Sequence, residues 1–415
     1  MLKNLTNLCV LIIIGKIIYI FNDVIMPDNW TLPENIVIPR IPEDSEFHES
    51  KWWNFDSKEY LSFLLHLMVT YEASDIYLTY WEPPALRIMQ RTLRVEWAGK
   101  LPDEVLMWFK NVLLKDEYEE HFEKEKAVDL WYSLHGRRYR VNVSLQRWHI
   151  MIVIRLLAEK VPTIDEMWLP PILKNLAHTS WWIIFLSWPT WSWKSTTLAA
   201  MVEEINQTKH KHIITIEDPV EYVFKPKLSV FEQKELWKDV TSFATAMKYA
   251  VRQRPDVILF WEIRDADSVR YAMSLAETWH LVLTTVHSRS AEQAINRLIS
   301  MFPTDEQPQI MNHLSENMIA IIIQKLVRKK DSKWMIAVHE ILLNNTPVSN
   351  TIRENKLNQI DNIIFSNRKY GMQLMDDCLV DHIISGDITL EIAMENARDQ
   401  SSIKRWLEQR WVKFN

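Results

Sequence analysis

The sequence contains very little glycine. Glycine makes up about 7% of an average chain, which would be roughly 29 residues for this length. Only 5 of the 415 residues are glycine, whereas tryptophan, normally among the rarest residues, occurs 20 times. The deficit of one residue and the excess of the other suggest that tryptophan is printed where glycine belongs, a hypothesis that the motifs of the chain can test.

Cysteine is scarce as well, and basic charge is not in excess. The two cysteines, Cys9 and Cys378, supply neither a disulfide framework nor a four-cysteine zinc site. A reducing cytoplasm is the natural compartment for such a chain. The formal net charge of −6 gives no overall positive field that would point to nucleic acid. Hydrophobic residues at 47% and charged residues at 25% exclude collagen-like and disordered classes.

Long hydrophobic runs are missing too. The apolar residues 8–21 are interrupted by Gly15 and Lys16, and the run is shorter than the roughly 20 residues that a spanning helix needs. Residues 28–50 are rich in proline and acidic residues, which is typical of a linker. We expect residues 1–50 to be a dispensable extension, or the product of a start codon placed too early, with a membrane anchor as the weaker alternative.

The rest of the chain predicts two domains. Residues 51–160 combine helical apolar spacing with alternating strand patterns, which indicates a small α+β domain. A proline-rich stretch begins residues 161–415, where continuous apolar strands alternate with helical patterns, as in a parallel sheet with crossover helices. The tail from about Pro303 is mostly helical by pattern. The predicted strands are 75–79, 138–143, 151–156, 183–187, 212–216, 256–260 and 281–286, and the predicted helices are 57–70, 195–205 and 266–277, with a charged helical stretch at 102–126.

Strand 183–187 leads into a loop that has the lysine and serine of a phosphate-binding loop. That motif, G-x-x-x-x-G-K-S/T, lies between a strand and a helix. Lys194 would reach the β- and γ-phosphates, Ser195 would hold Mg²⁺, and the start of the following helix would direct free N–H groups at the phosphates. The candidate nucleotide-binding residues are Trp188, Pro189, Thr190, Trp191, Ser192, Trp193, Lys194, Ser195 and Thr196.

With the printed letters, this loop does not work. Its backbone has to wrap the phosphates in conformations with φ > 0 that only glycine adopts cheaply. Three indole rings would also fill the space of the phosphates. On these letters alone, Lys194 is most simply an exposed loop lysine.

Three further motifs place acids and histidines at the ends of predicted strands. Residues 214–221 read I-T-I-E-D-P-V-E and put three carboxylates at the end of a buried strand. Residues 256–265 read D-V-I-L-F-W-E-I-R-D, an apolar strand that ends in Glu262, the form of a Walker B element. Residues 279–287 have a histidine at each end of one strand. Taken singly, each motif also fits a solvated loop or an ordinary buried strand.

In order and spacing, the four motifs together resemble the type IV pilus twitching-motility (retraction) ATPases, which are PilT/PilU-like members of the secretion ATPase superfamily. That family carries the loop G-P-T-G-S-G-K-S-T, an Asp box I-E-D-P-(V/I)-E, a Walker B D-V-I-L-x-G-E-x-R-D and a His box G-H-L-V-L-T-T-x-H. The resemblance runs from about Ala73 to near the C-terminus. It implies an α/β fold with a RecA-like P-loop ATPase domain in residues 161–415, preceded by a small α+β (PAS-like) domain in residues 51–160.

The departures from the family motifs are nearly all tryptophans at glycine positions. They are Trp81, Trp148, Trp182, Trp188, Trp191, Trp193, Trp237, Trp261 and Trp279. Random decay would not strike glycines alone while sparing Lys194, Glu262 and His287. We therefore hypothesise that the gene uses UGA for glycine and that UGA was translated as tryptophan. The alternative is a true pseudoenzyme with a blocked loop.

The resemblance implies a role for each site residue. ATP would bind the phosphate loop, Ser195 and Glu262 would serve Mg²⁺ or its waters, and Glu217 would orient and deprotonate the attacking water. His287, and less surely His280, would sense the γ-phosphate or contact a neighbouring subunit.

Arginines of the N-terminal domain reach the nucleotide in this family, and Arg140 and Arg147 are the matching candidates here. Their alternative reading is solvated strand charge.

The resemblance also implies a homo-oligomer, a hexameric ring, that powers type IV pilus retraction. Such a motor would be cytoplasmic and peripheral at the inner face of the cell membrane, docked on the pilus inner-membrane platform, with no nucleic-acid partner. The nearest alternative is a pilus extension or type II secretion ATPase, which usually carries a four-cysteine insert and a larger N-terminal region. A non-catalytic motor subunit follows if the tryptophans are real.

Overall fold

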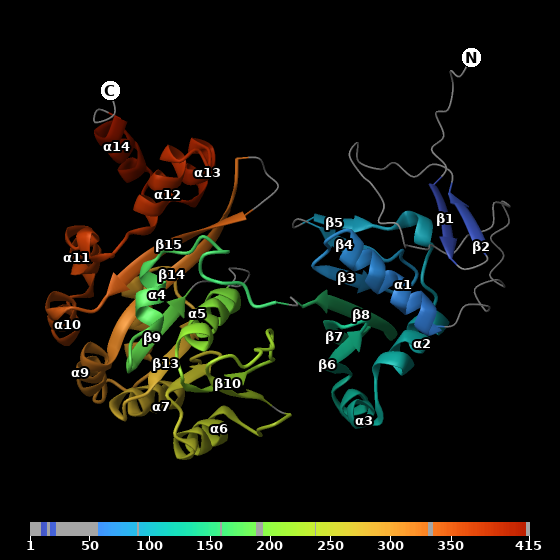
Figure 1. Cartoon of the computed structure of the whole chain (residues 1–415), viewed down its shortest axis with the longest axis horizontal. Helices are drawn as coiled ribbons and strands as arrows, with labels where there is room; N and C mark the ends of the chain where they lie inside the picture. The colour runs from blue at the N-terminus through green and yellow to red at the C-terminus, as the bar shows by residue number, and fades with distance from the viewer. Residues whose placement is uncertain are drawn as a thin grey trace. The chain divides into compact units, whose positions relative to one another are not determined.

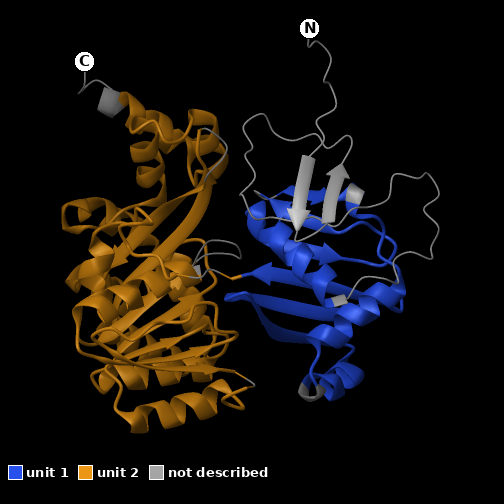
Figure 2. Cartoon of the chain, turned by 45° about the vertical axis from the view of Figure 1, so that its right-hand side comes forward, with its two compact units in different colours: residues 1–156 blue, residues 157–415 orange. Residues whose placement is uncertain are grey.

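The structure is a computed structural model. It describes residues 10–14, 17–21, 57–88, 91–157, 160–187, 194–236, 238–330 and 335–411. The predicted linker at 28–50 and six of the candidate phosphate-loop residues, 188–193, lie outside these ranges. The chain divides into two compact units, residues 1–156 and residues 157–415 (Figure 2), and each has its own hydrophobic core.

The elements follow one another along the chain as labelled in Figure 1. The strands are β1 (Val10–Ile14), β2 (Ile17–Phe21), β3 (Asp75–Leu78), β4 (Ala85–Ile88), β5 (Arg91–Arg94), β6 (Ala127–Leu134), β7 (Arg137–Gln146), β8 (His149–Leu156), β9 (Trp182–Ser187), β10 (His212–Glu217), β11 (Val230–Glu235), β12 (Val257–Phe260), β13 (Leu281–Val286), β14 (Met318–Arg328) and β15 (Met335–Leu343). The α-helices are α1 (Ser57–Thr70), α2 (Asp103–Leu113), α3 (Asp116–Glu125), α4 (Ile172–Ala177), α5 (Lys194–Thr208), α6 (Phe243–Ala250), α7 (Ala266–Glu277), α8 (Ala291–Ser300), α9 (Gln307–Asn317), α10 (Thr346–Arg353), α11 (Ile360–Ser366), α12 (Met375–Ile384), α13 (Leu390–Asn396) and α14 (Gln400–Trp411).

The first unit is built on a six-stranded antiparallel sheet in the order β5-β4-β3-β8-β7-β6. One face of this sheet is buried and the other is partly exposed. In strand β7, Tyr139, Val141 and Val143 are buried, and the residues between them are only partly buried. This alternation follows from the two-residue period of a strand. The apolar stripes of α1 and α2 belong to the same core, so the predicted α+β arrangement is confirmed.

The second unit is built on a seven-stranded sheet in the order β11-β10-β12-β13-β9-β14-β15. All neighbouring pairs are parallel except β14 and β15, which are antiparallel. The four central strands β9, β10, β12 and β13 are buried along almost their whole length. Burial on both faces explains their continuous apolar sequences and confirms the predicted parallel sheet.

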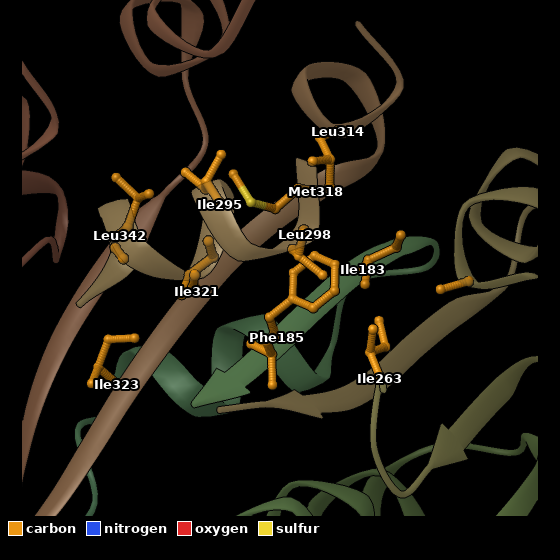
Figure 3. Packing of buried hydrophobic residues seen from close by; sticks show 14 of the residues in the cluster. Ile183, Phe185, Ile263, Ile295, Leu298, Leu314, Met318, Ile321, Ile323 and Leu342 are labelled. Carbon is orange, nitrogen blue, oxygen red and sulfur yellow. The ribbon is translucent and has the colours of Figure 1, made fainter. Parts of the chain in front are cut away.

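Alternate residues of the central strands enter two separate cores, one on each face of the sheet. Leu186 packs in a cluster that includes α4 and α5, whereas Phe185 packs in the cluster that includes α7, α8 and α9. Figure 3 shows Phe185 of β9 beside Leu298 of α8. Helix α8 buries Ala291, Ala294, Ile295, Leu298 and Ile299, the spacing that keeps one helical stripe against a sheet.

The C-terminal tail contains two strands that were not predicted. Strands β14 and β15 pair over nine residues each and complete the sheet beside β9. The continuous apolar run of β14 fits a buried helix as well as a buried strand, so periodicity alone does not separate them. From Thr346 onward the tail is helical, as expected, and Figure 1 shows α12 next to the β14–β15 pair.

Within the described ranges, no helix is both long enough and apolar enough to cross a membrane.

Candidate nucleotide-binding site

The carboxyl ends of the parallel strands bring most of the predicted site residues to one edge of the sheet. Register pairs join the ends of the strands: Ile216 of β10 faces Phe260 of β12, and Val286 of β13 faces Ser187 of β9. Glu217 ends β10, while Glu262 and His287 follow β12 and β13. In open α/β sheets this edge is where ligands bind.

The frame of a phosphate loop is present at the same edge. Strand β9 ends at Ser187 and the 15-residue helix α5 begins at Lys194, so the candidate loop connects a buried strand to a helix N-terminus. The Ser187 hydroxyl donates to the carbonyl of Ser288 (2.9 Å) and accepts from its N–H (2.8 Å), which fixes the end of β9 against the segment after β13. A helix N-terminus in this position favours a bound phosphate.

Glu217 is a buried carboxylate, with 3% of its surface exposed. Its Oε1 accepts hydrogen bonds from the Thr215 hydroxyl (2.7 Å) and the Gln233 amide (3.2 Å). Burial raises the pKa of Glu217 to about 7, although these two hydrogen bonds act to lower it. A carboxyl group with a pKa near 7 is suited to accept a proton at neutral pH.

Glu262 and His287 form a pair at the same edge. Nε2 of His287 lies 2.9 Å from Oε1 of Glu262, and Nε of Arg264 donates to the other carboxylate oxygen at 3.0 Å. The structure thus brings together two residues that were predicted from different motifs. Arg264, the second partner, was not predicted.

His280 is not part of this edge. It precedes β13, whereas His287 follows it, and seven residues of strand span roughly 20 Å. His280 is buried, and its Nδ1 lies 2.9 Å from the carbonyl oxygen of Leu275 and 3.0 Å from the Thr278 hydroxyl. It therefore has a structural role, which the sequence motif did not distinguish from a functional one.

The two candidate arginines lie in the first unit. Nη2 of Arg140 on β7 donates to Asp129 on β6 at 3.2 Å. Arg147 lies in the exposed turn between β7 and β8. Their proposed role at the nucleotide remains a prediction.

Several of the suspect tryptophans have a backbone that suits glycine. In the described chain φ is positive at Trp81 (57°), Trp148 (71°), Trp182 (106°) and Trp279 (69°), and also at Trp168 (56°), which was not suspected from the motifs. Positive φ is an outlier for so bulky a residue. Trp148 and Trp168 are also 93% and 88% exposed. Of the other predicted glycine positions, Trp261 lacks a positive φ, and the rest lie outside the described ranges.

Two hairpin turns of the first unit give a direct comparison. The turn between β6 and β7 is His135-Gly136, with φ of 49° and 75°. The turn between β7 and β8 is Arg147-Trp148, with φ of 49° and 71°. Two central residues with positive φ define a type I′ turn, in which glycine is favoured second. Tryptophan thus takes in one hairpin the position that glycine takes in the other.

Ser195 and Glu262 carry the kind of oxygen ligand that Mg²⁺ bound with nucleotide would need. Among the described residues, no group of three or more His, Cys, Asp or Glu side chains could hold a metal ion. Mg²⁺ bound with nucleotide needs only one or two protein ligands, because phosphate oxygens and water supply the others. Ser195, in the first turn of α5, and Glu262 offer oxygen ligands of this kind.

Two residues of this region were missed from the sequence. Gln233 on β11 contacts Glu217, and the Tyr222 hydroxyl lies 2.8 Å from the hydroxyl of Thr196, a predicted nucleotide-binding residue on α5. Neither belongs to a family motif that we used. Gln233 lies opposite Thr215 in the parallel pairing of β10 with β11, which the sequence alone does not state.

Comparison with known proteins identifies the family. The family model for "Type II/IV secretion system protein" matches residues 135–389, more than half of the chain. The chain belongs to this family. It is 34% identical to the type IV pilus retraction ATPase PilT of Pseudomonas aeruginosa over 79% of this chain and 94% of the relative. It is 35% identical to the twitching motility protein of Neisseria gonorrhoeae over 77% of this chain and 86% of the relative.

A solved structure agrees with these relatives. The crystal structure of the pilus retraction motor PilT with bound ADP is 36% identical, with a TM-score of 0.76 over 82% of this chain and 98% of that chain. The predicted membership in the PilT-like secretion ATPases, and with it the predicted P-loop ATPase class, is therefore confirmed. The predicted α/β fold is confirmed by the same match.

Proposed function

We propose that this protein hydrolyses ATP to power the retraction of a type IV pilus. The observation that carries the proposal is the placing of a buried carboxylate, Glu217, and the Glu262–His287 pair at the sheet edge that carries the β9–α5 connection. The similarity to pilus retraction ATPases over most of the chain supports retraction, rather than extension, of the pilus.

Hydrolysis needs a water held in line with the γ-phosphate. The water oxygen bonds to the γ-phosphorus, the bond from that phosphorus to the β–γ bridging oxygen breaks, and ADP and inorganic phosphate form. Glu217 takes the proton of the water. Its burial and raised pKa suit a group that accepts a proton at neutral pH.

The other site residues bind and orient. Lys194 and the N–H groups of the loop would hold the phosphates, and Ser195 and Glu262 would hold Mg²⁺, which would neutralise phosphate charge. His287 fixes the Glu262 carboxylate through their 2.9 Å contact. Arg140 and Arg147 would supply positive charge to the transition state from the first unit.

This function requires glycine in the phosphate loop. We infer that the natural chain has glycine at the tryptophan positions of the family motifs, through UGA codons read as tryptophan. The positive φ values of Trp81, Trp148, Trp182 and Trp279 support this inference, and they add Trp168 to the set. We call the chain with glycine at these ten positions the glycine form: 81, 148, 168, 182, 188, 191, 193, 237, 261 and 279.

Two measurements test the proposal. The first is the mass of the tryptic peptide 175–194 from the source cell, which we expect to show glycine at positions 182, 188, 191 and 193. The second is ATP hydrolysis by the glycine form, compared with the printed chain and with Lys194→Ala in the glycine form. We expect activity in the glycine form alone. Tryptophan at positions 188, 191 and 193 of the natural peptide, or activity that survives Lys194→Ala, would overturn the proposal.

We further propose that the motor is a hexameric ring, docked at the cytoplasmic face of the membrane on the pilus platform. If the natural peptide carries tryptophan at positions 188, 191 and 193, the chain is instead a non-catalytic motor subunit. That subunit would assemble without hydrolysing ATP.

A further inference from the structure

Gln233 lies on β11, at the edge of the large sheet, and its amide makes three hydrogen bonds. Nε2 donates to Oε1 of Glu217 at 3.2 Å and to the carbonyl oxygen of Tyr222 at 2.9 Å. Oε1 accepts from the backbone N–H of Phe224 at 2.9 Å. One side chain thus holds the carboxylate of Glu217 and the segment that follows it.

The sheet register explains how this side chain reaches Glu217. Gln233 is paired with Thr215, and paired residues of neighbouring strands project from the same face. Both therefore lie on the face that carries Glu217, two residues farther along β10. The Thr215 hydroxyl and the Gln233 amide donate to the same oxygen of Glu217, which fixes the plane of the carboxylate.

The segment held by Gln233 reaches the helix that follows the phosphate loop. Residues 218–229 contain no helix or strand. Gln233 binds this segment at Tyr222 and Phe224, and the Tyr222 hydroxyl meets the Thr196 hydroxyl on α5 at 2.8 Å. The Phe224 ring stacks on Phe231 of β11, with centroids 4.9 Å apart. The amide therefore joins the base to the helix that carries the phosphate-binding residues.

We infer that Gln233 is a positioning residue of the hydrolysis reaction, which holds the Glu217 carboxylate in a fixed orientation relative to the start of α5. This rests on the proposed role of Glu217 as the base. An amide suits the task because it has no charge to lose and offers donors and an acceptor at once. A base that must meet a water in line with a phosphate loses much of its effect when its orientation is loose.

The chain offers a matched control for Gln233. Gln253, which ends η3 (Val251–Gln253), also donates to a carboxylate, that of Glu232 at 2.9 Å, and accepts from Lys234 at 2.6 Å. Gln253 is exposed and makes no described contact with Glu217. The same substitution at both positions removes an amide that bonds a carboxylate, in one case that of Glu217 and in the other that of Glu232.

The test compares Gln233→Met, Gln253→Met, Glu217→Gln and the Gln233→Met/Glu217→Gln double variant, all in the glycine form. We measure kcat for ATP hydrolysis and the affinity for a non-hydrolysable ATP analogue. We expect Gln233→Met to lower kcat by about 10- to 100-fold, as for loss of a residue that orients a catalytic group, with affinity within about twofold. Gln253→Met should leave both values unchanged.

The double variant separates positioning from general support of the fold. If Gln233 acts through Glu217, its loss should cost nothing further once Glu217→Gln has removed the base. An equal loss in both backgrounds, or a kcat of Gln233→Met within twofold of the parent, would overturn the inference. Should Gln233→Met fail to fold, Gln233→Glu replaces it, because it keeps the acceptor for Phe224 and removes the donors.

The failure of the proposed function has a different signature. A glycine form without ATP hydrolysis, or a Glu217→Gln variant as active as its parent, rejects Glu217 as the base and the inference with it. A glycine form that is active, is stopped by Glu217→Gln and tolerates Gln233→Met rejects the inference alone.

Discussion

At the scale of single residues, the site combines groups that are costly to the fold. Glu217 is a carboxylate in a buried strand. Burial raises its pKa to about 7, because ionisation is less favourable there than in water. The tryptophans with positive φ are a second cost, which a change of residue would remove. Both costs can be measured as stability.

We predict that Glu217→Gln stabilises the glycine form at high pH and has little effect at low pH. Below pH 4.5 the carboxyl is protonated in both the folded and the unfolded chain. Between about pH 4.5 and 7 the unfolded chain ionises while the folded chain keeps its proton, so the stability of the parent falls as pH rises. The difference should reach about 3 kcal/mol by pH 8.

Urea unfolding at pH 4, 6 and 8 measures this difference, with the exposed Glu395→Gln as the control. A difference between Glu217→Gln and parent that does not change with pH would show that Glu217 ionises normally in the folded chain.

We predict that Trp148→Gly stabilises the printed chain, by about 1 kcal/mol. The left-handed conformation costs a side-chain-bearing residue about 1–2 kcal/mol, which exceeds what glycine loses in the unfolded state. Trp148 is 93% exposed, so the change removes little packing.

Trp108→Gly is the opposite case, because Trp108 is in the interior of α2 and packs against the core of the first unit. Its replacement should cost at least about 3 kcal/mol. Free energies of unfolding for both variants test the distinction. If Trp148→Gly destabilises the chain as Trp108→Gly does, tryptophan is native at position 148.

At the scale of elements, the C-terminal helices are joined to the sheet by a buried charge. Glu340 on β15 is fully buried and accepts from the N–H of Ala291, the first residue of α8, at 2.7 Å. Nη1 of Arg398, between α13 and α14, donates to its other oxygen at 2.8 Å, and Nη2 reaches Asp361 of α11 at 3.1 Å. The Glu340 carboxylate and the two ion pairs of Arg398 thus connect the sheet edge with α8, α11 and the segment between α13 and α14.

We predict that Arg398→Met destabilises the second unit by about 3–5 kcal/mol, because it leaves the buried Glu340 carboxylate without its cation. Arg405→Met serves as the control, because Arg405 lies on α14 and its described side-chain hydrogen bond is to the Ser402 hydroxyl, at 3.5 Å. Thermal and urea unfolding of the two variants provide the measurement. Equal stability of Arg398→Met and the parent would mean that the C-terminal helices dock without the pair.

The sequence was informative about elements with one clear period. The predicted ranges of α1, α7 and β13 coincide with the structure, because a helical stripe or a doubly buried strand leaves one interpretation. The stretch 102–126 is two helices, α2 and α3, and β14 and β15 were missed. The apolar sequences of β14 and β15 do not indicate which strands these segments pair with.

Within the site, motif residues were predictable and their partners were not. Glu217, Glu262 and His287 follow strands whose parallel order places their ends together. Gln233 contacts Glu217 only because β11 lies beside β10 in the sheet, which no pattern in the sequence states.

At the scale of the whole molecule, we predict a six-membered assembly of the glycine form. Six copies of the printed 49.5 kDa chain would have a mass of about 297 kDa, and six copies of the lighter glycine form slightly less, as closed cyclic symmetry would give. Light scattering or sedimentation with an ATP analogue measures the mass. The Glu217→Gln variant should assemble equally well, because the substitution removes the proposed base of ATP hydrolysis and should leave subunit contacts unchanged. A chain that stays monomeric under these conditions contradicts the ring.

The two type I′ hairpins of the first unit also concern how a gene is translated. Both turns favour glycine at their second central position, and the printed sequence has glycine in one turn and tryptophan in the other. If one codon for glycine were translated as tryptophan, tryptophan would be printed at positions where a positive φ favours glycine. If the source organism reads UGA as glycine, a synthetic gene that copies the printed letters would direct a different protein from the natural one.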